Sequence, residues 1–99
     1  MSNEVANTIL AQLGGRRFIA MTGSSNFLGD TKSLTFKVGR NAYKVTHVRI
    51  TLNVADLYDI EWLNVRAGKI KQAAQSSFGI YADMLQAEFT RVTGMATHL

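Results

Sequence analysis

The chain has 99 residues, of which 46% are hydrophobic, and a formal net charge of +4. This length and hydrophobicity fit one domain over residues 1–99 with its own core and exclude a disordered chain, while the absence of cysteine excludes disulfides and thiolate metal ligands. The basic balance favours an anionic partner, either a nucleic acid or an acidic protein surface.

The N-terminal third predicts one helix and one short strand. Apolar side chains recur at four-residue spacing from Val5 to Leu13, and a glycine pair follows them. This pattern predicts a helix over residues 3–13. Residues 18–22 are apolar and predict a strand, and residues 23–26 are rich in turn-forming side chains.

The middle of the chain predicts antiparallel strands. Residues 33–38 alternate between apolar and polar side chains, and residues 43–53, after a glycine-containing turn, are rich in β-branched side chains. Residues 56–65 alternate as a strand does but also suit a helical turn. We favour a strand because a glycine follows, as in a β-meander, and residues 69–77 predict a short, polar edge strand. Whether all of residues 56–77 is strand stays open.

The clearest helix comes last. Apolar side chains recur at helical spacing from Tyr81 to Val92, and Gly94 occupies the usual position of a terminating glycine. Ser76 or Ser77 is the expected N-cap. The predicted fold is therefore α+β: an antiparallel sheet of three to five strands, with an N-terminal and a C-terminal helix packed on one face.

A run of basic residues without any acidic one lies between Thr31 and Ala55, mostly on predicted strands. Its members are Lys32, Lys37, Arg40, Lys44 and Arg49. Basic side chains neutralise phosphates, and aromatic rings offer stacking faces to unpaired bases. We therefore predict a surface that binds nucleic acid or an acidic partner. Its candidate residues are Arg16, Arg17, Lys37, Arg40, Tyr43, Lys44, His47 and Arg49.

Catalytic and metal-binding patterns are weak. Asp56, Asp59 and Glu61 form one acidic cluster, and on a strand the last two share a face, where paired carboxylates perform acid–base chemistry or hold Mg²⁺. We prefer cross-strand pairing with the basic residues. The two histidines, His47 on a strand and His98 in the tail, are too few for a metal site. We expect no enzyme, cofactor or metal.

Tyr58 and Trp62 allow two interpretations. If the helices cover their face of the sheet, both belong to the core, which is the interpretation that we prefer. If that face is open, they are possible anchors for a protein partner, because aromatic side chains dominate interface hot spots.

The hydropathy of the chain bears on its location. Met1 to Glu4 lacks the basic start and apolar stretch of a signal peptide, and no apolar run approaches the roughly 20 residues that span a bilayer. We expect a cytoplasmic protein that has no membrane partner.

Several segments carry a resemblance to known sequences. They are residues 14–15 with 18–23, residues 48–53 with 56–59, and residues 79–85 with 93–94. In them the chain resembles small, uncharacterised proteins encoded by bacteriophages and prophages. The resemblance implies a phage or mobile-element origin, and hence the host cytoplasm, but no assigned activity. The Arg16–Arg17 pair is more basic than the group leads us to expect.

Three functions remain as hypotheses. The first is a small non-catalytic phage accessory protein that binds nucleic acid through a basic sheet face. The second is a protein-binding inhibitor of a host or defence system, similar in role to anti-CRISPR proteins. The third is a structural or virion assembly component. We expect a monomer or a small homo-oligomer.

Overall fold

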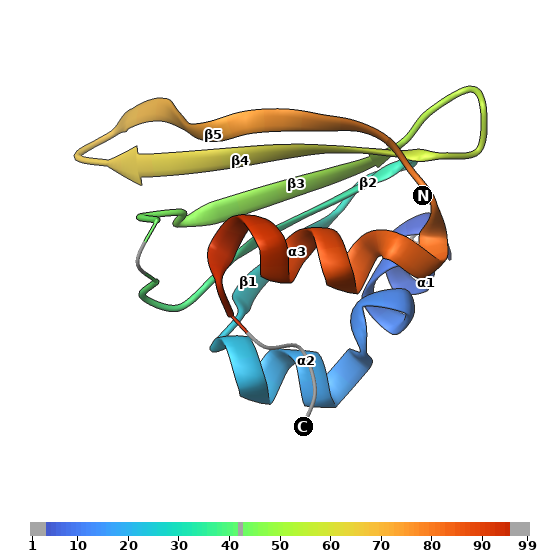
Figure 1. The fold of residues 1–99 in the computed structure, drawn as a ribbon, viewed down its shortest axis with the longest axis horizontal. Coiled ribbons are helices and arrows are strands. Elements are labelled where there is room, and N and C mark those ends of the chain that lie inside the picture. Colours follow the sequence, from blue (N-terminus) through green and yellow to red (C-terminus); the bar gives the residue numbers. More distant parts are fainter. Residues whose placement is uncertain (1–3, 42, 96–99) are drawn as a thin grey trace.

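The computed structural model describes residues 4–41 and 43–95. These residues form three α-helices, a 3-10 turn and a five-stranded sheet (Figure 1). The helical elements are α1 (Glu4–Leu13), α2 (Gly15–Thr22), η1 (Ala82–Met84) and α3 (Leu85–Thr93). The strands are β1 (Ser25–Gly29), β2 (Ser33–Lys37), β3 (His47–Leu52), β4 (Tyr58–Arg66) and β5 (Lys69–Ile80).

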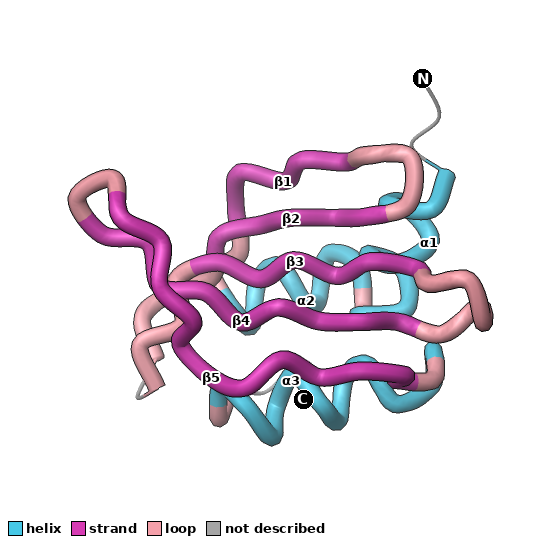
Figure 2. Tube along the Cα trace, turned by 90° about the horizontal axis from the view of Figure 1, so that it is seen from above, coloured by secondary structure: helices cyan, strands magenta, loops and turns pink. Residues whose placement is uncertain are grey.

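The sheet is a meander in which each strand pairs antiparallel with the next, in the order β1-β2-β3-β4-β5. All three α-helices lie on one face of this sheet, and the other face is open (Figures 1 and 2). The predicted α+β class, with helices from both ends of the chain on one side of an antiparallel sheet, is confirmed. None of the helices in the described ranges is long and apolar enough to cross a membrane.

The prediction for residues 18–22 is wrong, because this segment belongs to helix α2. Phe18 and Thr22, one helical turn apart, are buried, and the Thr22 hydroxyl donates a 2.7 Å hydrogen bond to the Phe18 carbonyl. The neighbouring Arg16 and Arg17 are exposed. A run of five residues is too short to distinguish a repeat of two from a repeat of 3.6.

Two other boundaries differ from the prediction. Strand β3 begins at His47, because residues 38–41 and 43–46 belong to a loop and not to a strand. Strand β5 continues through Ser76 and Ser77 to Ile80, so neither serine caps the last helix. That helix begins later, at Leu85, and ends at the predicted Gly94, which has the left-handed φ of 74°.

Large aromatic side chains fill the space between the sheet and the helices. The Phe18 ring meets Phe36 and Phe89 edge-on, with ring centroids 5.6 and 4.9 Å apart. Trp62 is completely buried and Tyr58 is 4% exposed. The preferred interpretation of this pair as core is therefore confirmed, and the alternative of an exposed partner patch is wrong.

Strand β5 is longer than the strand it pairs with. Its 12 residues lie beside the nine of β4, and the register shifts three times along the pair. Tyr58 pairs with Ile80 and Ile60 with Ser77, so three steps along β5 match two along β4. Each shift inserts one extra residue into β5, which is the pattern of a β-bulge.

Candidate nucleic-acid interface

A basic groove lies at the end of the sheet where β2 ends, β3 begins and the β4–β5 hairpin turns. It consists of two adjoining cavities of about 570 and 420 Å³, which share Lys44, Asn64 and Arg66. Six cationic residues line it: Lys37, Arg40, Lys44, Arg66, Lys69 and Lys71. No aspartate or glutamate occurs among its described lining residues. An anion entering the groove therefore meets charge of one sign.

The Asn41 side chain organises the β2–β3 loop, which forms one wall of the groove. Its amide nitrogen donates hydrogen bonds to the carbonyls of Gly39, at 3.0 Å, and Val45, at 2.7 Å. Its oxygen accepts from the N–H groups of Tyr43, at 3.2 Å, and Val45, at 3.1 Å. One side chain thus makes four hydrogen bonds to the backbone of the loop.

The loop is also tied to strand β4. The Asn64 amide donates to the carbonyl of Lys44 at 2.7 Å, and Lys44 itself has a left-handed φ of 59°, which is uncommon for a residue other than glycine. The Thr46 N–H donates to the Leu63 carbonyl at 2.9 Å, and the Thr46 hydroxyl accepts from the Val65 N–H at 2.7 Å. These bonds fix the loop against the hairpin.

Gly39 anchors the same loop to helix α2. Its N–H donates a 2.9 Å hydrogen bond to the Thr22 carbonyl at the end of that helix. A Cβ atom on residue 39 would lie 2.8 Å from this carbonyl oxygen. Only glycine allows the loop to approach the helix so closely.

The β4–β5 ribbon, residues 63–72, forms the other wall. Arg66 pairs with Lys69 and Asn64 with Lys71, and these two pairs alternate with Val65 opposite Ile70 and with Leu63 opposite Gln72. Because alternate pairs point to opposite faces of a sheet, the cations share the face that lines the groove, and the apolar pair lies on the other face. Figure 2 shows the turn of the ribbon extending past the ends of β2 and β3.

The structure separates the predicted site residues into different places. Lys37, Arg40 and Lys44 line the groove. His47 and Arg49 lie on β3, and Arg49 projects from the open face of the sheet. Arg16 and Arg17 belong to α2, in the helical layer behind the sheet (Figure 1), so the structure does not bring them to the groove.

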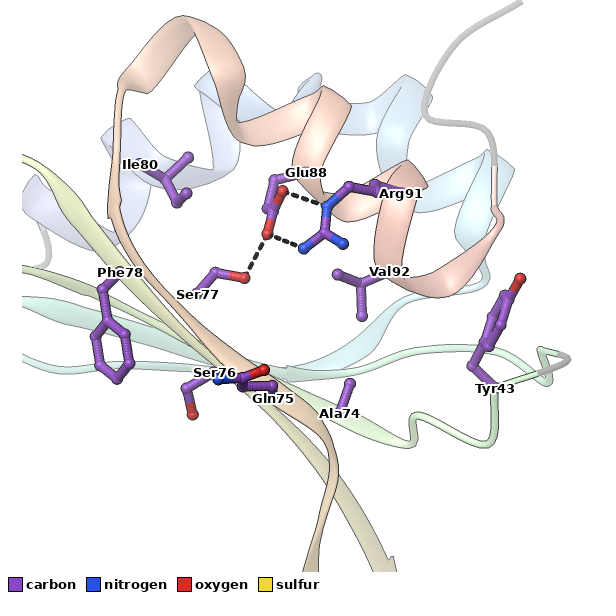
Figure 3. Close-up of a pocket in the computed structure, with 10 residues that line it drawn as sticks. All are labelled: Tyr43, Ala74, Gln75, Ser76, Ser77, Phe78, Ile80, Glu88, Arg91 and Val92. Carbon is purple, nitrogen blue, oxygen red and sulfur yellow. Dashed lines mark hydrogen bonds and ion pairs between the residues drawn. The ribbon is translucent and has the colours of Figure 1, made fainter.

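Tyr43 does not line the groove either. It borders a cavity of about 500 Å³ between β5 and α3 (Figure 3). Its ring lies 3.2 Å from the position that a Cβ atom on Gly94 would take. The expectation that Tyr43 stacks on a base beside the basic residues therefore finds no support in its position.

Three cations of the groove were missed by the sequence prediction. Arg66, Lys69 and Lys71 follow the basic run of residues 31–55 by more than ten positions, and only strand pairing brings them beside Lys44. A signal exists in the sequence, since Arg66 and Lys69 flank a two-residue turn at Ala67 and Gly68. Both turn residues have positive φ, 52° and 78°, as in a type I′ hairpin.

The open face of the sheet carries mixed charge. Arg49 pairs in register with Glu61, and Thr51 with Asp59, as cross-strand pairing requires, although no ion pair joins the described side chains of Arg49 and Glu61. The Asp59 carboxylate accepts 3.1 Å hydrogen bonds from the Asn53 amide and the Gly79 N–H. Asp59 therefore stabilises the adjoining backbone turn and strand.

His47 is partly buried at the start of β3, opposite Lys37. Burial, and then the charge of Lys37, lower the pKa of His47 below its ordinary value. His98 lies outside the described residues. Within the described ranges, no group of three His, Asp or Glu side chains could hold a metal ion.

A second polar cluster lies between β5 and α3 (Figure 3). The Ser77 hydroxyl accepts a 3.1 Å hydrogen bond from the Trp62 indole and donates to the Glu88 carboxylate. Arg91 binds the same carboxylate at 2.6 and 2.8 Å. These hydrogen bonds hold the pKa of Glu88 below its usual value, against the effect of burial. The cluster joins helix and strand, and the carboxylate beside the serine is already paired with Arg91.

Known proteins do not assign a function to this site. No family model matches the chain, and neither the curated proteins nor the solved structures contain a significant match. The resemblance to small phage proteins therefore stays a prediction. The function has to be argued from the basic groove itself.

Proposed function

We propose that this protein is a small, non-catalytic accessory protein of the phage type that binds nucleic acid through the basic groove. The observation that supports this function is the gathering of six cations around one groove without a carboxylate. Polyphosphate backbones present regularly spaced negative charge, so a row of fixed cations gains affinity by releasing condensed counterions.

The groove is a better candidate than the open face of the sheet. On that face Arg49 is opposite Glu61, and Asp59 precedes Glu61 by two residues on the same strand. The field of one cation is therefore offset by neighbouring carboxylates. At the groove, Arg66 pairs with Lys69 across the hairpin, so the fields of the two cations add.

The salt dependence of binding tests the proposal. Each phosphate contact contributes a slope of about −0.9 to the change of log affinity with log salt, so a groove that uses most of its cations has a steep slope. The measurement is fluorescence anisotropy of labelled oligonucleotides at several salt concentrations. Absence of binding at low salt, or binding that is insensitive to salt, contradicts the proposal.

A matched pair of charge reversals locates the binding surface. Arg66→Glu with Lys69→Glu changes two cations of the groove, and Arg16→Glu with Arg17→Glu changes two exposed cations of α2. Both pairs change the net charge equally. We expect the first pair to abolish binding and the second to leave most of it. Equal losses would show that net charge, and not the groove, determines affinity.

A protein-binding inhibitor is the second candidate, and one observation favours it. Phe78, Tyr81 and Met84 are exposed near the junction of β5 and η1, and the last two line a mostly apolar hollow of about 320 Å³. Apolar side chains exposed together are typical of interaction surfaces. After nuclease treatment, a host protein retained by the wild type and by the Arg66/Lys69 variant, but lost from Tyr81→Ser, would favour inhibition.

A further inference from the structure

We infer that the nucleic acid is duplex DNA and that the β4–β5 ribbon enters its major groove. This inference rests on the proposed function and goes further by naming the partner and the element that reads it. The starting observation is exposure: each residue from Arg66 to Gln72 is exposed, and the ribbon extends beyond the neighbouring strands (Figure 2).

The dimensions of the ribbon suit the major groove of B-form DNA. Two paired strands lie about 4.8 Å apart, and a two-stranded ribbon with its side chains fits a groove about 12 Å wide. The major groove of duplex RNA is too deep and narrow for such an element. The shape of the ribbon therefore favours DNA over RNA.

The two faces of the ribbon suit the two surfaces that a DNA groove presents. On one face Arg66, Lys69 and Lys71 continue the cations of the β2–β3 loop and are placed to contact one phosphate backbone. On the other face Ile70 is 68% exposed and lies outside the hydrophobic core. An exposed isoleucine on a projecting ribbon is placed to touch base edges, such as the methyl group of thymine.

The lining of the basic groove argues against single strands. Proteins that bind single strands combine cations with aromatic side chains on which the bases stack. The described lining of the basic groove contains Lys, Arg, Asn, Thr, Val, Gly and Ala, without an aromatic ring. Binding by this groove therefore depends on phosphates, and a duplex presents two backbones of them.

The ribbon is held in place before DNA arrives. The turn at Ala67 and Gly68 has the type I′ geometry, whose twist matches that of the paired strands. The Asn64 amide joins the base of the ribbon to the carbonyl of Lys44 in the opposite wall. A preformed arm loses little conformational freedom on binding.

The first test compares nucleic acids of one sequence by fluorescence anisotropy: duplex DNA, duplex RNA and single-stranded DNA. We expect the full-length protein to bind duplex DNA most tightly. A single strand or an RNA duplex bound as tightly as duplex DNA overturns the inference but leaves the proposed function intact. Absence of salt-dependent binding to all three overturns both.

The second test compares substitutions of two exposed aliphatic side chains, Ile70 and Leu28. Ile70→Ser should weaken duplex binding roughly fivefold, the effect of removing about one partly buried apolar contact. Leu28→Ser is the control, because Leu28 is 69% exposed on the opposite edge strand, β1. Equal effects of the two substitutions would remove Ile70 from the interface.

The third test detects whether the protein occupies the major groove of the DNA. Guanine N7 lies in the major groove, so a short duplex saturated with protein should be protected from methylation at N7. The Arg66→Glu/Lys69→Glu protein provides the unprotected reference. Binding of the wild type without N7 protection would overturn the placement of the ribbon.

Discussion

The Asn64 side-chain amide donates a 2.7 Å hydrogen bond to the backbone carbonyl of Lys44, a residue 20 positions earlier in the chain. This bond connects the two walls of the basic groove, since Lys44 belongs to the β2–β3 loop and Asn64 to the β4–β5 ribbon. The relative position of the cations on the two walls therefore depends on an uncharged side chain.

The first prediction concerns this bond. Asn64→Ala should lower the free energy of unfolding by about 1 kcal/mol, the usual net contribution of such a hydrogen bond. It should also weaken nucleic-acid binding without changing the charge, because one of the hydrogen bonds that join the two walls is lost. Urea denaturation and anisotropy measure the two effects. Asn7→Ala, at an exposed position of α1, is the control and should change neither.

The second prediction concerns the approach of the loop to α2. Gly39→Ala places a Cβ atom 2.8 Å from the Thr22 carbonyl oxygen, a backbone atom that cannot move alone. We expect a loss of about 1–3 kcal/mol in the free energy of unfolding, as for other overpacked positions. An unfolding midpoint equal to that of the wild type would show that the loop moves aside without cost.

The third prediction separates the groove from the open face. Lys44→Glu should reduce nucleic-acid affinity and flatten its salt dependence, because Lys44 lines both cavities of the groove. Arg49→Glu, with the same change of charge, should have a smaller effect, because Arg49 lies beside Glu61 in the middle of the open face. Anisotropy at several salt concentrations measures both. A larger effect of Arg49→Glu would return the binding surface to the open face.

The fourth prediction concerns acid stability. Because its hydrogen bonds to Arg91 lower the folded-state pKa of Glu88, this carboxylate stabilises the fold above the unfolded-state pKa near 4.5, and that contribution is lost as the pH falls through the folded-state pKa. Glu88→Gln should therefore be less stable than the wild type at neutral pH, with a difference that shrinks in acid. Urea midpoints over a pH series measure it. Parallel curves for the two proteins would contradict this role.

His47 adds to the same trend at higher pH. Its pKa is lowered in the folded protein, so the unfolded chain takes up a proton first as the pH falls below 6.5. Folding stability therefore decreases on acidification through this range. In His47→Gln this part of the pH dependence should be absent, and the urea midpoints of the same pH series would detect it.

The sequence correctly predicts the strands in which apolar and polar side chains alternate clearly. It also predicts the helices in which apolar side chains recur at helical spacing over several turns. Residues 33–38 alternate over a full strand length, and the structure has β2 there. Residues 18–22 span little more than one helical turn, so local preference cannot decide between helix and strand. The contact of Phe18 with Phe36 and Phe89, which are distant in the chain, stabilises the helix.

The basic groove could be predicted only in part. Lys37, Arg40 and Lys44 lie within ten residues of one another, and their shared charge is visible in the sequence. The position of Arg66 and Lys69 beside them depends on the register of the pairs β3–β4 and β4–β5, which is a tertiary property. The wrong prediction of a strand at residues 18–22 also affects the predicted site, because such a strand would place Arg16 and Arg17 beside the sheet.

The three extra residues of β5 have a consequence for the free edge of the sheet. A β-bulge interrupts the even spacing of N–H and C=O groups on both sides of its strand, so the outer edge of β5 offers no long ladder that matches a foreign strand. Lys69 and Lys71 add like charges that repel a second copy of the same edge. Both features disfavour the addition of a second copy along the β5 edge of the meander.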